Sequence, residues 1–124
     1  MIKTLPELWN LIELFEMEPV YVYGEENKIP WYYSTLNFKL IRNNKTLDIT
    51  ISPAYGIIDI WLSIENIKII DMNLEDVDGM KIEKSHGKEI LHIIFSTEDT
   101  IQKLIIETKP NIYIYLSKPV KRSG

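Results

Sequence analysis

The feature that most constrains the fold is a regular alternation of apolar and polar residues in the middle of the chain. Residues 36–40, 47–52 and 58–64 each place an apolar side chain at every second position. This period of two is typical of a β-strand that buries one face and exposes the other to water. Asn43-Asn44-Lys45 separates the first two segments and favours a tight turn. The sequence therefore predicts a β-hairpin followed directly by a third strand.

Shorter apolar segments, separated by polar turn residues, complete the pattern. They are residues 20–23, 67–72, 80–84, 89–96, 103–108 and 111–117. No helical pattern separates successive strands, which argues against a parallel α/β sheet. Isoleucine dominates the apolar residues and Ala54 is the only alanine, a composition that suits strands. We expect a mainly β (α+β) fold, an antiparallel β-sandwich or open barrel of seven to eight strands with one N-terminal amphipathic helix.

The helix is predicted near the N-terminus, where the apolar spacing changes to three and four residues. The residues with this spacing are Leu5, Leu8, Trp9, Leu11, Ile12 and Phe15. Thr4 and Glu7 fit a capping box, in which each side chain bonds the backbone N–H of the other residue. Pro19 predicts that the helix ends near Met17 or Glu18.

The residue types that usually catalyse reactions or bind metals are scarce. With no cysteine, the chain offers no thiolate metal ligand and no cysteine nucleophile. His86 and His92 are the only histidines, and two histidines alone do not complete a metal site. The acidic stretch that begins at Asp71 fails the calcium-loop pattern, because Asp76 and Ile82 occupy its glycine and glutamate positions. The sequence predicts a protein that is not an enzyme and that needs no metal or cofactor.

The distribution of charge favours binding to another protein. The formal net charge is −4, which argues against nucleic acid as a partner, because nucleic acid requires a basic surface. Acidic residues gather in the first 26 residues, with six glutamates against one lysine, and again between Asp71 and Asp78. Such clusters can steer a basic partner, although a charged cluster is more often an ordinary solvated surface.

The chain shows no sign of a boundary between domains. We expect a single globular domain over residues 1–117 and a basic, flexible tail over residues 118–124. No run of 18 apolar residues and no signal-like segment is present. These features predict a cytoplasmic protein without a membrane partner.

Several aromatic residues lie at the polar phase of their strands. If Ile60 and Leu62 face the core, Trp61 between them faces away from it, and Tyr113 and Tyr115 behave likewise. Tyrosine and tryptophan on an outer face are typical anchors of protein interfaces. Alternatively, the N-terminal helix packs over this face and buries them. Both interpretations are open from the sequence.

Four motifs carry a resemblance to a known family. They are Trp31-Tyr32-Tyr33-Ser34, Ile64-Glu65-Asn66-Ile67-Lys68-Ile69, Asp78-Gly79-Met80 and Asn111-Ile112-Tyr113-Ile114. In these the chain resembles the small immunity proteins of bacterial polymorphic-toxin systems, especially the immunity protein 50 type. Thr35-Leu36-Asn37 stand where that pattern has a His-Asp pair, so no functional residue carries over. The resemblance implies a cytoplasmic protein that binds a cognate toxin and blocks it stoichiometrically, without catalysis.

These observations support one leading hypothesis and two alternatives. The leading hypothesis is a small cytoplasmic bacterial binding protein, an immunity protein that neutralises a basic toxin domain. The alternatives are a sandwich or barrel that holds a small apolar ligand in an enclosed cavity, and a homo-oligomerising structural domain, such as a homodimer, that buries its outer aromatic residues against a copy of itself. Under the leading hypothesis, the predicted partner-binding residues are Glu13, Glu16, Glu25, Glu26, Trp31, Tyr32, Tyr33, Trp61, Asp71, Glu75, Asp76 and Asp78.

Overall fold

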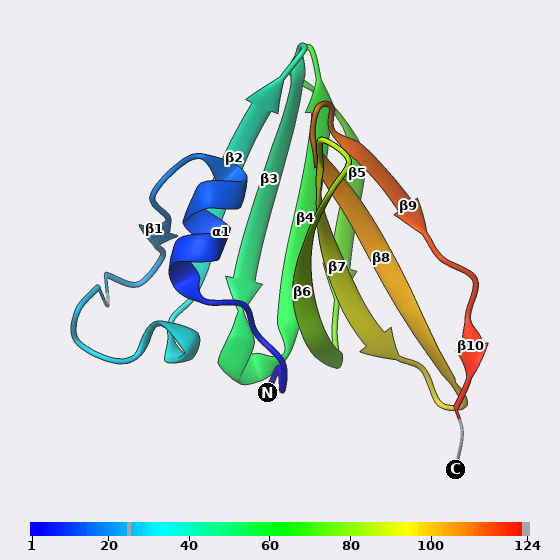
Figure 1. Cartoon of the computed structure of the whole chain (residues 1–124). Coiled ribbons are helices and arrows are strands. Elements are labelled where there is room, and N and C mark those ends of the chain that lie inside the picture. Colours follow the sequence, from blue (N-terminus) through cyan, green and yellow to red (C-terminus); the bar gives the residue numbers. More distant parts are fainter. Residues whose placement is uncertain (25, 123–124) are drawn as a thin grey trace.

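Two antiparallel sheets face each other in the computed structural model, which describes residues 1–24 and 26–122 (Figure 1). The first sheet follows chain order and consists of β1 (Val20–Tyr21), β2 (Leu36–Arg42), β3 (Lys45–Ser52), β4 (Ile57–Ile64) and β5 (Ile67–Leu74). The second has the order β10-β8-β7-β6, with β9 also paired to β8, and consists of β6 (Val77–Ser85), β7 (Lys88–Ser96), β8 (Thr100–Lys109), β9 (Tyr113–Leu116) and β10 (Val120–Lys121). The predicted antiparallel sandwich is confirmed, with ten strands among the described residues.

Two tight turns set the register of the first sheet. Asn43 and Asn44 join β2 to β3, and Glu65 and Asn66 join β4 to β5, all with φ between 48° and 67°. Positive φ at both central residues is characteristic of the type I′ turn, whose twist matches that of the flanking strands. Asparagine adopts this backbone conformation more readily than most residues. The hairpin predicted from the alternating pattern is therefore confirmed, together with the turn that closes it.

The apolar positions of the alternation, apart from Ile64, point between the two sheets and form one continuous core. On the first sheet the buried side chains are Leu36, Phe38, Leu40, Leu47, Ile49, Ile51, Ile58, Ile60 and Leu62. On the second sheet and the loop before β9 they are Val77, Met80, Leu91, Ile93, Leu104, Ile106 and Ile112. A single cluster of this kind makes the two sheets one packing unit.

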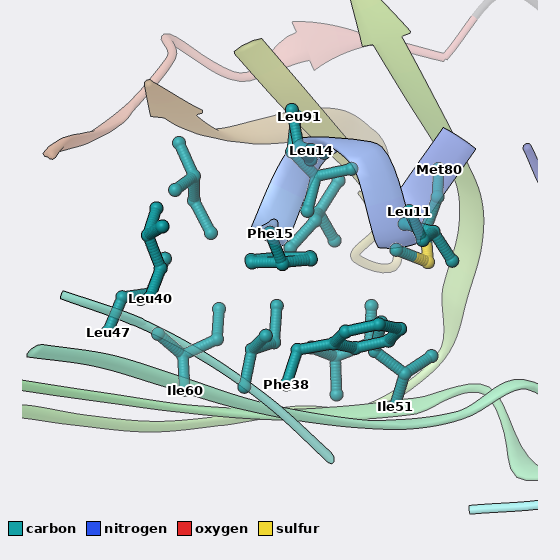
Figure 2. Packing of buried hydrophobic residues seen from close by; sticks show 14 of the residues in the cluster. Leu11, Leu14, Phe15, Phe38, Leu40, Leu47, Ile51, Ile60, Met80 and Leu91 are labelled. Atoms are coloured by element: carbon teal, nitrogen blue, oxygen red, sulfur yellow. The ribbon is translucent and has the colours of Figure 1, made fainter. Parts of the chain in front are cut away.

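Helix α1 (Leu8–Phe15) lies against the inner face of the first sheet and completes this core (Figure 2). Leu11, Leu14 and Phe15 are its buried residues, at the three- and four-residue spacing of one helix face. The ring of Phe15 stacks on that of Phe38 in β2, with 4.9 Å between the centroids. The helix therefore covers the inner face, and the outer face of the first sheet stays open.

The predicted capping box is not formed. Glu7 precedes the helix but makes no side-chain capping bond. Thr4 instead forms a parallel bridge with Gly79 in β6, and its carbonyl oxygen accepts the N–H of Met80 at 2.8 Å. The free edge of β6 offers unpaired backbone groups, and pairing with them extends the N-terminal segment so that Thr4 cannot reach the helix.

Trp9, which has the apolar spacing of the predicted helix, does not pack against the core. Its side chain is 63% exposed. At 3.6 residues per turn, Trp9 lies about 200° around the helix from Leu11, on the side away from the sheet. Leu8 and Ile12, which share the apolar spacing with Trp9, do pack against the core. The spacing alone therefore does not distinguish Trp9 from its partly buried neighbours.

The segment from Lys118 to Arg122, which the sequence predicts to be part of a flexible tail, contains strand β10. Within it, Val120 pairs with Ile101 in β8. The backbone N–H of Arg122 donates to the carbonyl oxygen of Asp99 at 2.9 Å. These bonds tie the segment to the edge of the second sheet.

Candidate functional site

The outer face of the first sheet carries a hollow whose lining side chains are polar apart from one tryptophan. The hollow, of about 500 Å³, is lined by Asn37, Lys39, Asp48, Thr50, Asp59, Trp61 and Asp71. We call it the outer hollow. Its lining residues occupy alternate positions of β2, β3, β4 and β5, out of phase with the buried residues. The same alternation that builds the core therefore builds the site.

Cross-strand pairing places these side chains in two rows. Asp48, Trp61 and Asp71 are direct neighbours across β3, β4 and β5. In the next row Asn37, Thr50, Asp59 and Asn73 follow one another across four strands. The rows are joined by the amide of Asn37, which donates to Asp48 Oδ1 at 2.7 Å and to Thr50 Oγ1 at 3.0 Å. These bonds hold the side chains at fixed positions on the rigid sheet.

Trp61 is the large apolar surface of the outer hollow. Its side chain is 45% exposed, so the helix does not cover it. The Nζ atom of Lys68 lies 3.9 Å from the centroid of the indole ring and 3.7 Å from Asp71 Oδ2. Trp61 therefore already has a cation over its face. Of the two interpretations that the sequence leaves open, exposure of Trp61 is the one that the structure supports.

Charges in the outer hollow are only partly compensated. Lys39 lies 3.8 Å from Asp48, and Lys68 pairs with Asp71. Asp59 accepts a hydrogen bond from the amide of Asn73, and no cation pairs with it among the described residues. One carboxylate is therefore in excess at the centre of the face. Asp48 and Asp59 are not among the binding residues predicted from the sequence, although their side chains point to the same face as that of Trp61.

Glu13 and Glu16, predicted to bind a partner, form ion pairs with residues of neighbouring strands. Glu13 pairs with Lys84 in β6, and Glu16 pairs with Arg42 in β2 and with Lys109 in β8 at 3.2 Å. The hydrogen bond from Arg42, and then that from Lys109, lowers the pKa of Glu16 below its ordinary value, and the hydrogen bond from Lys84 does the same for the pKa of Glu13. Their negative charge is thus compensated within the molecule.

Other predicted acidic residues lie apart from the outer hollow. Glu75 and Asp76 form the exposed connection between β5 and β6. Asp78 is half-buried in β6, where its carboxylate accepts a hydrogen bond from the hydroxyl of Ser96. Glu26 is exposed in the loop after β1, and Glu25 lies outside the described residues.

The predicted aromatic residues at positions 31–33 form a short 3₁₀ turn, η1 (Trp31–Tyr33). Trp31 is half-buried and packs against the core, whereas Tyr32 and Tyr33 are exposed. This turn lies beside the second short turn, η2 (Pro53–Tyr55). The structure therefore does not gather all predicted residues into one surface. Of the predicted set, only Trp61 and Asp71 line the outer hollow.

A second set of aromatic side chains lies on the outside of the second sheet. Tyr113 and Tyr115 in β9 are 58% and 43% exposed, with 5.4 Å between their ring centroids. The helix does not reach this face, because it packs beside β2 and β3, on the side of the molecule away from β9 (Figure 1). These two residues are exposed, as the interface interpretation requires.

The two histidines lie apart and have different partners. His92 Nε2 lies 2.7 Å from Glu83 Oε1, and His86 Nδ1 lies 2.7 Å from the hydroxyl of Ser85. Among residues 1–24 and 26–122, no group of three histidine, cysteine or acidic residues is placed to hold a metal ion. No helix in the same part of the chain is long and apolar enough to cross a membrane.

The outer hollow and two further surface hollows of the described residues do not match the cavity that the apolar-ligand hypothesis predicts. That hypothesis requires an enclosed space lined by isoleucine and aromatic side chains. The outer hollow is open and mainly polar. The second hollow lies between the start of the chain and β6, and the third lies around the turn that joins β6 to β7.

Comparison with known proteins yields a likeness of fold. No family model matches the sequence, and no curated protein matches it. The fold is similar to that of a chain in a solved structure, a contact-dependent growth inhibition toxin–immunity protein complex from Klebsiella pneumoniae 342. The similarity has a TM-score of 0.78 at 20% sequence identity and covers 94% of this chain and 96% of that one. It supports, at the level of the fold, the resemblance to immunity proteins predicted from the sequence.

Proposed function

We propose that this chain is an immunity protein, which binds a cognate toxin domain in the cytoplasm and neutralises it without catalysing a reaction. The observation that carries the proposal is the likeness of fold to a chain of a toxin–immunity complex, which extends over almost the whole of both chains. The sequence contains no recognisable catalytic motif, which is compatible with a stoichiometric binding protein.

The outer hollow is the surface that best suits this role. It combines an exposed tryptophan with fixed polar groups on a rigid sheet, and aromatic anchors of this kind carry much of the binding energy of protein interfaces. Its excess carboxylate favours a basic partner, since complementary charge accelerates association. The proposal thus replaces the scattered acidic residues of the sequence prediction with one face centred on Trp61.

Binding to the product of the neighbouring gene tests the proposed function. The complete chain and the candidate toxin domain are co-purified, and their affinity is measured by calorimetry. We expect a one-to-one complex in which the toxin loses its activity. A neighbour without a toxin domain, together with no detectable complex, would contradict the proposal.

Two tryptophan variants test the location of the interface. Trp61→Ala is expected to raise the dissociation constant by about tenfold or more, the size typical of an aromatic hot spot. Trp9→Ala is the matched control, because Trp9 is also an exposed tryptophan but lies on the helix, away from the outer hollow. Equal losses in both variants would show that the outer hollow is not the main contact.

Self-association is a second candidate function, favoured by the exposed pair Tyr113 and Tyr115 on the edge strand β9. Such a face could bury itself against a second copy of the chain. Sedimentation of the isolated protein distinguishes the cases. A concentration-dependent dimer that Tyr113→Ser abolishes would support self-association, and a monomer at all concentrations would exclude it.

A further inference from the structure

Lys68 reaches the outer face of the first sheet only because of an irregularity in the pairing of β4 and β5. Trp61 pairs with Asp71 and Leu62 with Ile70, but the next residue of β4, Ser63, pairs with Lys68. Ile69 is therefore an extra residue on β5. Without this bulge Lys68 would have the phase of Ile70 and point toward the other face, because side chains alternate along a strand.

The bulge places the positive charge of Lys68 beside an aromatic ring and a carboxylate. The ammonium group of Lys68 lies 3.9 Å from the centroid of the Trp61 ring and 3.7 Å from the carboxylate of Asp71. An aromatic face flanked by a carboxylate is an arrangement that recognises cations. The chain's own lysine therefore shows which kind of group this part of the outer hollow accepts.

Lys68 does not fill the outer hollow or satisfy its charge. Its side chain is about half exposed, and exposed ion pairs and cation–π contacts are individually weak. Asp59, one row away on the same strand as Trp61, has no cation beside it among the described residues. A second cation can therefore enter, or take the place of Lys68, at little cost.

We propose that the outer hollow is a receptor for an arginine or lysine side chain of the protein partner, and that Lys68 is an internal stand-in which this side chain displaces. This inference rests on the proposed function, since it assigns the partner chemistry of the same site. The incoming group lies over Trp61 and donates hydrogen bonds to Asp59 and Asp71. An arginine fits better than a lysine, because its planar guanidinium both stacks on an indole and bridges two carboxylates.

The first experiment uses no toxin. The Trp61 indole N–H signal of the complete chain is assigned in an NMR spectrum by comparison with Trp61→Phe, and N-acetyl-arginine amide is then titrated. We expect a saturable shift of this signal, and none with N-acetyl-citrulline amide, the uncharged analogue. Equal shifts with both compounds, or no saturable shift with the arginine compound, would overturn the proposal.

Variants of the same protein test the role of each group. Asp59→Asn keeps an oxygen that can accept the hydrogen bond from Asn73, so the fold is retained while the charge is lost. It is expected to weaken binding of the arginine compound by about tenfold, as for loss of a charge-assisted hydrogen bond. Lys68→Ala is expected to strengthen binding, because the competing cation is gone. Glu98→Gln, an exposed carboxylate in the turn before β8, is the control and should change nothing.

The same variants in complex with the toxin separate this inference from the proposed function. If the toxin binds and Asp59→Asn weakens the complex while Glu98→Gln does not, both stand. If the toxin binds equally well to all variants, the receptor role of the outer hollow is wrong although the protein is an immunity protein. If no toxin binds but the arginine compound does, the cation site stands and its partner is another basic protein. Weaker binding in Lys68→Ala would also overturn the inference, because Lys68 would then be a contact rather than a stand-in.

Discussion

At Phe38 three independent features coincide: the strand alternation, complete burial and a stacked aromatic partner from the helix. Replacing Phe38 with alanine would leave a cavity between helix and sheet and remove the contact with Phe15. We expect Phe38→Ala to lower the free energy of unfolding by about 3–5 kcal/mol. Ile41→Ala is the control on the same strand, since Ile41 is 72% exposed, and should cost about 1 kcal/mol or less. Urea denaturation measures both, and similar losses would contradict the packing described for the core.

At the level of single residues, the sequence predicted which side of a strand each side chain faces but not which strands meet. The alternation around Trp61 placed it on an outer face, and its exposure confirms this. Asp48, Asp59 and Asp71 come from three different strands, so they form no acidic run along the chain. Their proximity depends on pairing register, which the local pattern does not contain. The position of Lys68 depends on a bulge that no residue type marks.

Among the elements, the helix shows how packing gives residues partners within the molecule that the sequence does not reveal. The sequence predicts Glu13 and Glu16 as partner-binding residues on the polar side of an amphipathic helix. The helix packs inside the sandwich, and this brings its polar side to cations on both sheets. Glu89 in β7 continues the chain of ion pairs, since it lies 2.6 Å from Lys109 and 3.7 Å from Lys84. The sequence predicted the existence of the helix, but not the face of the sheet that it would cover.

These ion pairs predict an acid-dependent component of stability. The pKa of Glu16 is lowered in the folded state, chiefly by Arg42, so its carboxylate binds a proton less readily in the folded than in the unfolded chain. The stabilisation is therefore present above the ordinary pKa of 4.5 and is lost as the pH falls through the lowered pKa. We expect Glu16→Gln to be less stable than the wild type at neutral pH and to converge with it in acid.

Urea denaturation across this pH range, with Glu98→Gln as the control, measures the effect. Glu98 is exposed and has no ion pair among the described residues, so its variant should follow the wild-type curve. Because Glu16 is about half exposed, solvent screening keeps the effect small, and added salt should reduce it further. A difference between Glu16→Gln and wild type that is independent of pH would argue against the ion pairs as its cause.

For the whole molecule, the predicted class of fold was correct because nearly all pairing is between strands consecutive in the chain. Each tight turn makes its two strands neighbours, and an antiparallel sheet follows without long-range information.

The division into two sheets was not predictable in the same way. It occurs at Glu75 and Asp76, where the sequence shows only a polar loop, and it depends on the core formed between the two faces. The N-terminal segment then joins the sheets, since the N–H of Ile2 donates to Pro53 and that of Lys3 donates to Asp78.

A core shared by both sheets and the helix predicts that the molecule unfolds as one unit. Neither sheet can separate without exposing the buried faces of the other, and the helix cannot leave without uncovering Phe38. In native-state hydrogen exchange with added denaturant, the most protected amides of α1, β3 and β7 should therefore converge on a single free energy of opening. Amides of the two-residue strand β10 provide the internal control, because an edge strand of this length frays locally and exchanges at a lower free energy. Retained protection in β6–β8 at denaturant concentrations where β2–β4 have lost theirs would mean that the sheets are separate units, and the shared core could not be the main source of stability.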